Sequence, residues 1–164
     1  MLQLISLVML AYAFFLVRAS LPELPPRIPT HFNAAGNPDG WGSPDVLWHV
    51  LGAQALVTVV FMIVPYLGQR FPSLIHFGSR RMSDFTTSQR ERMLPMLNDM
   101  AGYLSIVMNI FFTYMLRAII QAAQQIHPSL HMGWPLGFLL GGTACILVYY
   151  FWKFSLAARE RGED

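Results

Sequence analysis

The residues best suited to chemistry in this sequence lie in one polar stretch, residues 21–43, which reads LPELPPRIPTHFNAAGNPDGWGS. His31, Asn33, Asp39 and Trp41 place an imidazole, an amide, a carboxylate and an indole within this stretch. These groups donate or accept hydrogen bonds. Loops of this kind commonly carry the binding residues of a protein. We therefore predict that these four side chains bind a ligand.

A second hypothesis makes the same region catalytic. His31, Asp39 and His49 would form a metal or acid–base cluster if the fold brought them together. The simpler interpretation is that His31 and Asp39 hydrogen-bond within their own loop, and we prefer it.

Another pair of histidines has the spacing of metal ligands. His127 and His131 are four residues apart and would share a face of a helix. Pro128 lies between them, however, and the pair lacks the glutamate of a metalloprotease helix. We predict that they are interfacial histidines and that the protein holds no metal and no cofactor.

Common catalytic signatures are missing from the sequence. It contains no phosphate-binding glycine loop, no GxSxG elbow and no HExxH motif. The single cysteine, Cys145, excludes an intrachain disulfide and a cysteine-based zinc site. We predict that the protein is not an enzyme.

The polar stretch is expected to be stiff, because each proline fixes its own φ and restricts the residue before it. An extended ribbon is predicted over residues 21–29, followed by a type I turn at Asn37–Gly40. Ser43 is expected to cap the next helix, with Pro44 in its first turn. The residues that we expect to set the shape of this loop are Pro22, Pro29, Gly36, Gly40, Gly42 and Ser43.

Composition places the chain in a membrane. The sequence is 54% hydrophobic and 12% charged, whereas a soluble domain carries about 25% charged residues. The net charge of +2 is too small to attract nucleic acid, so the bilayer is the predicted partner.

Four apolar segments predict transmembrane spans at residues 2–18, 46–67, 100–120 and 134–153. Backbone groups in lipid must bond internally, so the spans must be helical. We therefore predict an all-α, four-helix transmembrane bundle with a proline-rich structured outer loop, forming a single membrane domain. The first segment resembles a signal peptide, but no Lys or Arg precedes it, so we expect it to be retained.

Orientation follows from the distribution of Lys and Arg, which collect on the cytoplasmic side. The loop at 68–99 is rich in arginine and the C-terminal tail is basic, whereas the loop at 19–45 has few cations. We predict that both termini and the loop 68–99 are cytoplasmic and that the loop 19–45 faces outward. A capping box from Ser88 to Glu91 predicts a short helix that meets Pro95.

Small and polar residues in the spans predict helix packing. Gly133, Gly137 and Gly141 form a stripe that would let helices approach closely, and packing within the chain is the favoured interpretation. Gly102, Ser105 and Asn109 form a similar stripe. Asn109 lies deep in its span and should face protein and find a hydrogen-bond partner.

One long motif resembles a known bacterial membrane family. Leu21-Pro22, Ile28–Asn33, Gly36 and Asp39–Ser43 resemble the pattern LPxxIPxHFNxxGxxDxWGS between two transmembrane helices, with extra residues between Pro22 and Ile28. This pattern is similar to the N-terminal domain of unknown function of SdpI-like proteins, which combine immunity against a secreted peptide with signalling. The resemblance runs from about Val8 to Leu67 and implies an outward-facing recognition loop.

We therefore predict a non-enzymatic inner-membrane protein that recognises a peptide, lipid or partner protein through its outer loop, for immunity or signalling. The first alternative is a small structural subunit of a larger membrane complex. The second is a metal-dependent membrane enzyme.

Overall fold

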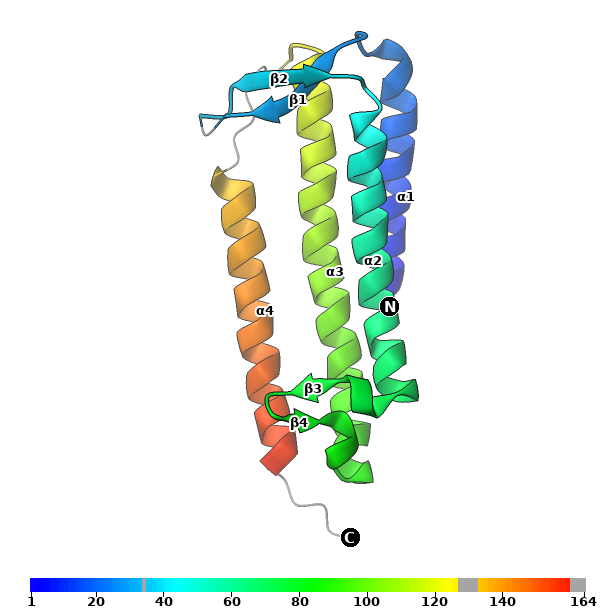
Figure 1. The fold of residues 1–164 in the computed structure, drawn as a ribbon, viewed down its shortest axis with the longest axis vertical. Coiled ribbons are helices and arrows are strands. Elements are labelled where there is room, and N and C mark those ends of the chain that lie inside the picture. Colours follow the sequence, from blue (N-terminus) through cyan, green and yellow to red (C-terminus); the bar gives the residue numbers. More distant parts are fainter. Residues whose placement is uncertain (34, 127–132, 160–164) are drawn as a thin grey trace.

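The computed structural model describes residues 1–33, 35–126 and 133–159. Within these ranges the long helices α1 (Leu2–Ser20), α2 (Val46–Arg70), α3 (Thr87–Ala123) and α4 (Gly133–Arg159) stand side by side (Figure 1). All four are long and apolar enough to cross a membrane. The predicted all-α membrane fold is confirmed, and the chain is a multi-pass membrane protein.

Helix α3 differs most from the sequence-based prediction. It is one helix of 37 residues that passes through Pro95, where a kink or the start of the third span was expected. Its length of about 55 Å exceeds the roughly 30 Å of a hydrocarbon core, so it extends beyond the bilayer. Met93 and Leu97 on either side of Pro95 are buried, and this packing keeps the helix continuous.

The start of α3 also corrects the prediction. The capping box is formed by Thr86 and Gln89, not by Ser88 and Glu91. The Thr86 hydroxyl accepts from the Gln89 amide at 3.3 Å, and Gln89 Oε1 accepts from the Thr86 amide at 3.0 Å. The helix therefore begins at Thr87, earlier than expected.

Helices α1, α2 and α3 share one apolar core. It contains Ala13, Val17, Leu47, Leu51, Leu116, Ile119, Ile120 and Ala123. Gly102 of α3 permits the close approach of α1, because a Cβ there would lie 2.7 Å from Leu2 Cβ. Packing of this kind, rather than apolar burial, holds helices together in lipid.

A buried polar cluster joins α2 to α3. Gln54 Nε2 donates to Asn109 Oδ1 at 2.8 Å, and Asn109 Nδ2 donates to Thr58 Oγ1 at 2.9 Å. Asn109 is 1% exposed, so it faces protein and is hydrogen-bonded, as the sequence predicted.

Helix α4 lies at the edge of the bundle and packs mainly on α3 (Figure 1). Nothing lies within 4 Å of a Cβ placed at Gly133, Gly137 or Gly141. The prediction that these glycines pack against other helices of the chain is therefore wrong. Their stripe lies on a face of α4 that the rest of the described chain leaves open.

Each end of the bundle carries a small antiparallel hairpin (Figure 1). Strands β1 (Ile28–Phe32) and β2 (Pro38–Gly42) cover one end, and β3 (His76–Phe77) and β4 (Arg80–Arg81) the other. Short 3₁₀ turns flank them: η1 (Leu21–Glu23), η2 (Pro72–Leu74) and η3 (Met82–Asp84). The ribbon expected at 21–29 therefore begins with a helical turn, and its backbone is extended at Leu24 and again in β1.

Candidate functional site

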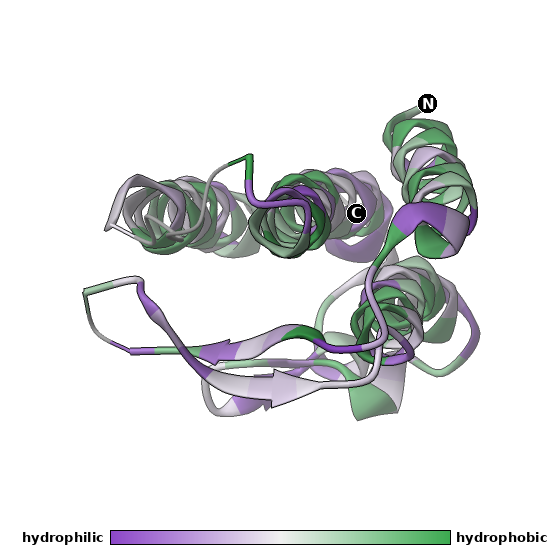
Figure 2. Cartoon of the chain, turned by 90° about the horizontal axis from the view of Figure 1, so that it is seen from above, coloured by the Kyte–Doolittle hydropathy of each residue, from purple (hydrophilic) through white to green (hydrophobic). Residues whose placement is uncertain are grey.

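The predicted recognition loop is the β1–β2 hairpin, which the bundle core anchors on one side. Ile28 is 0% exposed and belongs to the same apolar core as α1, α2 and α3. Pro29 is fully buried, and Phe32 packs against the core. Seen down the bundle, the strands are coloured mainly hydrophilic or neutral, whereas green predominates on the helices (Figure 2). The hairpin is thus a polar element held in place by a few apolar residues.

The hairpin turn lies earlier than predicted. Pro38–Gly42 is strand β2, so the expected turn at Asn37–Gly40 is wrong. Asn33 Oδ1 instead accepts from the amides of Ala35 and Asn37, both at 3.0 Å. Gly36 has a φ of +81°, which a residue without Cβ adopts at no steric cost. Asn33 therefore shapes the turn, and its carbonyl oxygen is engaged within the hairpin.

Glycines on β2 allow the two strands to lie close together. A Cβ at Gly40 would lie 2.8 Å from His31 Cβ, and one at Gly42 would lie 3.0 Å from Thr30 Cγ2. His31 and Gly40 are cross-strand partners next to irregularities in the register. Gly40 thereby sets the position of the His31 side chain.

The structure brings together two of the predicted site residues. His31 Nδ1 and Asp39 Oδ1 form a short hydrogen bond across the hairpin. The His31 side chain is 73% exposed and that of Asp39 is 42% exposed. The pair therefore braces the hairpin and at the same time presents an imidazole and a carboxylate to the surroundings.

Trp41 lies on β2 opposite Pro29 and is 55% exposed. Arg27 and Trp41 line a shallow hollow of about 170 Å³. An exposed indole beside a guanidinium suits stacking and recognition of a polar or anionic group. Arg27 is the residue directly before β1, the strand that carries His31.

His49, the third residue of the hypothetical metal cluster, is not grouped with His31 and Asp39. Among residues 1–33, 35–126 and 133–159, no three side chains of His, Cys, Asp or Glu are grouped so as to hold a metal ion. His49 lies in the first turn of α2 and does not join His31 and Asp39. His127 and His131 lie outside the described residues.

Ser43 links the hairpin to α2. Its Oγ accepts from the Asp45 amide at 3.3 Å and donates to Asp45 Oδ2 at 2.8 Å. The Ser43 carbonyl accepts from Val46, the first residue of α2, at 3.2 Å. The N-cap of α2 is Asp45, with no side-chain cap hydrogen bond, and the helix begins at Val46. The prediction that Ser43 caps this helix with Pro44 in its first turn is therefore wrong, and Ser43 instead bonds Asp45 in the connection between β2 and α2.

Residues 5–58 match the family described as Domain of unknown function (DUF1648). The match runs from α1 through the β1–β2 hairpin into α2 and includes the whole polar stretch at 21–43. Neither the curated proteins nor the solved structures gave a match. The matched region is thus the hairpin together with the two helices that hold it.

Sequence reasoning missed two features. Gln54 and Thr58 form the polar cluster with Asn109, and their signal was a pair of polar residues four apart in an apolar helix. A cavity beside the β3–β4 hairpin was also missed. It depends on residues far apart in the chain, which no local pattern relates.

Proposed function

We propose that this protein is a non-enzymatic membrane protein that recognises a peptide or protein partner through its outer hairpin. The observation that carries the proposal is the exposed surface of β1–β2. Trp41 stands there beside Arg27, and the His31–Asp39 pair faces outward. An aromatic anchor with adjacent polar groups on a rigid support is the usual composition of a binding hot spot.

Orientation supports an outward-facing site. The end of the bundle with β3–β4 carries Arg70, Arg80, Arg81, Arg90 and Arg92. The opposite end, with β1–β2, carries Arg18, Arg27 and Arg117. By the positive-inside rule the β3–β4 end is cytoplasmic, which places both termini inside and the β1–β2 hairpin outside. From the family resemblance we propose that this membrane is the bacterial inner membrane.

The proposed role in immunity or signalling is based on the family resemblance. The motif that resembles SdpI-like proteins lies within residues 5–58, which match the domain of unknown function. We propose an immunity or signalling function in which a secreted peptide is the partner of the hairpin.

Site-specific photo-crosslinking in cells tests the proposal. A photoreactive residue at position 41 should give a discrete crosslink, whereas one at Trp134, which is 62% exposed on α4, should not give the same product. His31→Ala should weaken the position-41 crosslink about fivefold or more if a hydrogen-bonded contact is lost. An unchanged crosslink in His31→Ala, or the same product from both positions, would refute recognition by the hairpin.

The second candidate is a structural subunit of a larger membrane complex. It is favoured by the open stripe of Gly133, Gly137 and Gly141 on α4, because such stripes allow close contact between transmembrane helices. Co-purification of a second membrane protein in stoichiometric amounts, lost in Gly137→Leu, would support it over recognition at the hairpin.

A further inference from the structure

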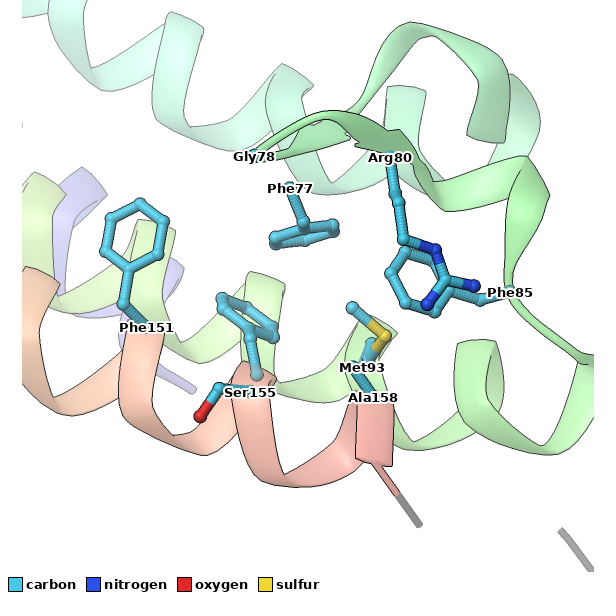
Figure 3. A pocket seen from close by; sticks show the side chains of 9 residues that line it. Phe77, Gly78, Arg80, Phe85, Met93, Phe151, Ser155 and Ala158 are labelled. Carbon is cyan, nitrogen blue, oxygen red and sulfur yellow. The ribbon is translucent and has the colours of Figure 1, made fainter. Parts of the chain in front are cut away.

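A cavity of about 220 Å³ lies between the β3–β4 hairpin, α3 and the end of α4. Figure 3 shows Phe77 and Arg80 on the hairpin side, Met93 from α3, and Phe151, Ser155 and Ala158 from α4. Ordinary small-molecule sites measure about 300–1,000 Å³. This cavity is therefore too small for a whole ligand of that kind and suits part of a longer molecule.

The lining is almost entirely apolar. The rings of Phe77 and Phe154 lie 4.5 Å apart between centroids, and those of Phe77 and Phe85 lie 6.4 Å apart. Met93 is 0% exposed, and Phe154 is 3% exposed. A guest in this space gains from burying hydrocarbon and has few polar partners inside.

Arg80 supplies a cation at the same cavity. Its guanidinium lies 4.1 Å from the centroid of the Phe85 ring, and one Nη donates to the Asp84 carbonyl at 3.1 Å. A guanidinium has five N–H donors in a planar fork, so further donors remain to bind a phosphate. The carboxylate of Asp84 accepts from the Arg81 amide at 2.8 Å. The two positive charges of Arg80 and Arg81 together exceed the single negative charge of the Asp84 carboxylate.

The position of the cavity along α4 corresponds to the membrane surface. Tyr149 and Trp152, which are exposed, lie close to Phe151 on α4. Lys153 Nζ lies 5.2 Å from the centroid of the Tyr149 ring. Tyrosine, tryptophan and lysine gather where hydrocarbon meets the headgroups. The cavity therefore opens at the level of lipid phosphates.

We propose that this cavity binds an anionic phospholipid of the surrounding leaflet. One acyl chain enters the cavity alongside the Phe77–Phe154 ring pair and Phe151, and the phosphate pairs with Arg80. An apolar slot next to a cation, at headgroup depth, matches the two parts of a phospholipid. The site is independent of the β1–β2 hairpin and of any partner bound there.

The test uses the full chain purified in a mild detergent and exchanged against an equimolar mixture of phosphatidylglycerol and phosphatidylcholine. Native mass spectrometry then gives the ratio of the two lipids retained. The wild-type protein should retain phosphatidylglycerol preferentially. Arg80→Gln should reduce this ratio about fivefold, the usual effect of one arginine near an anionic surface. Arg70→Gln, the matched control, removes an equal charge from a side chain that does not line the cavity and should change the ratio little.

A second pair of variants tests the apolar half of the site. Ala158→Leu should fill the cavity and lower retention of both lipids, whereas Ala144→Leu, on the lipid-facing side of α4, should not. The proposal is overturned if the wild type shows no preference or if Arg70→Gln acts like Arg80→Gln. It is also overturned if glycerol phosphate displaces the lipid as well as phosphatidylglycerol does, which would identify a site for a soluble phosphate.

Discussion

Gln54 of α2 and Asn109 of α3 are joined by a 2.8 Å hydrogen bond inside the bundle, with both residues almost completely buried. Asn109 Nδ2 also donates to the Ser105 carbonyl at 2.9 Å. The Gln54–Asn109 hydrogen bond connects the two helices inside the bundle. A side-chain amide without a hydrogen-bond partner there would cost free energy.

Asn109→Leu should therefore weaken the contact between α2 and α3. Hydrogen bonds between transmembrane helices contribute about 0.6 kcal/mol on average, and up to about 1.7 kcal/mol. We expect a loss in this range, because Gln54 Nε2 would lose its 2.8 Å bond to Asn109 and keep only the 3.3 Å bond to Thr113 Oγ1. Unfolding in mixed detergent micelles measures it. Gln54→Leu with Asn109→Leu should cost less than the sum of the single variants, and strict additivity would mean that the bond contributes nothing.

Two glycines of the β1–β2 hairpin should respond differently to substitution. Gly40→Val should disrupt the pairing of β1 with β2, because a Cβ at position 40 would lie 2.8 Å from His31 Cβ. Gly36→Ala should cost about 1–2 kcal/mol through its positive φ alone and leave the strands paired. Hydrogen exchange of the hairpin amides measures both effects. Equal protection in Gly40→Val and wild type would contradict this structure of the hairpin.

The sequence predicted the helices well, because lipid forces each long apolar segment into a helix. The expected spans at 2–18, 46–67, 100–120 and 134–153 fall within α1, α2, α3 and α4. The prediction failed at Pro95, because it weighed the missing amide and not the burial of Met93 and Leu97. Tertiary packing of that kind has no local signature.

The turn of the β1–β2 hairpin could not be placed from local sequence alone either. Its prolines and glycines predicted a loop of defined conformation. The pattern NAAGNPDG, however, is compatible with a turn at either of two positions. In the structure the turn lies at Asn33–Gly36, because the Asn33 side chain accepts hydrogen bonds from two backbone amides there while β2 pairs with β1. His31 and Asp39 were named from the sequence as possible partners, and the cross-strand register brings them together.

Topology can be tested directly. Reporter fusions after Asn37, in the β1–β2 turn, and after Ser79, in the β3–β4 turn, should report opposite sides of the membrane. The arginines near Ser79 predict that this fusion reports the cytoplasm. Alkaline phosphatase and fluorescent protein fusions give complementary readouts, and two fusions on the same side would contradict the arrangement of α2 between them.

The β3–β4 hairpin should lose order in acid. The hydrogen bond from the Arg81 amide holds the pKa of Asp84 below its ordinary value of 3.8, with help from Ser83 and the charges of Arg81 and Arg80. The stabilisation is therefore complete above that ordinary value and is lost as the pH falls through the lower folded pKa. The protection factors of the hairpin amides, which correct for the intrinsic pH dependence of exchange, should be constant from neutral pH to about pH 5 and fall below about pH 4. Asp84→Asn should remove the acid step, and a step that persists in this variant would assign it to another group.

Two glycine stripes allow a matched test of helix packing. A Cβ at Gly102 would lie 2.7 Å from Leu2 Cβ, whereas nothing lies within 4 Å of one at Gly137. Gly102→Leu should therefore destabilise the bundle by about 1–3 kcal/mol through overpacking. Gly137→Leu should change its stability by less than about 0.5 kcal/mol. Thermal unfolding in detergent compares them, and size-exclusion chromatography reports association. A large loss of stability in Gly137→Leu in a monomeric preparation would contradict the placement of α4. A smaller apparent size without lost stability would show that its glycine stripe contacts another chain.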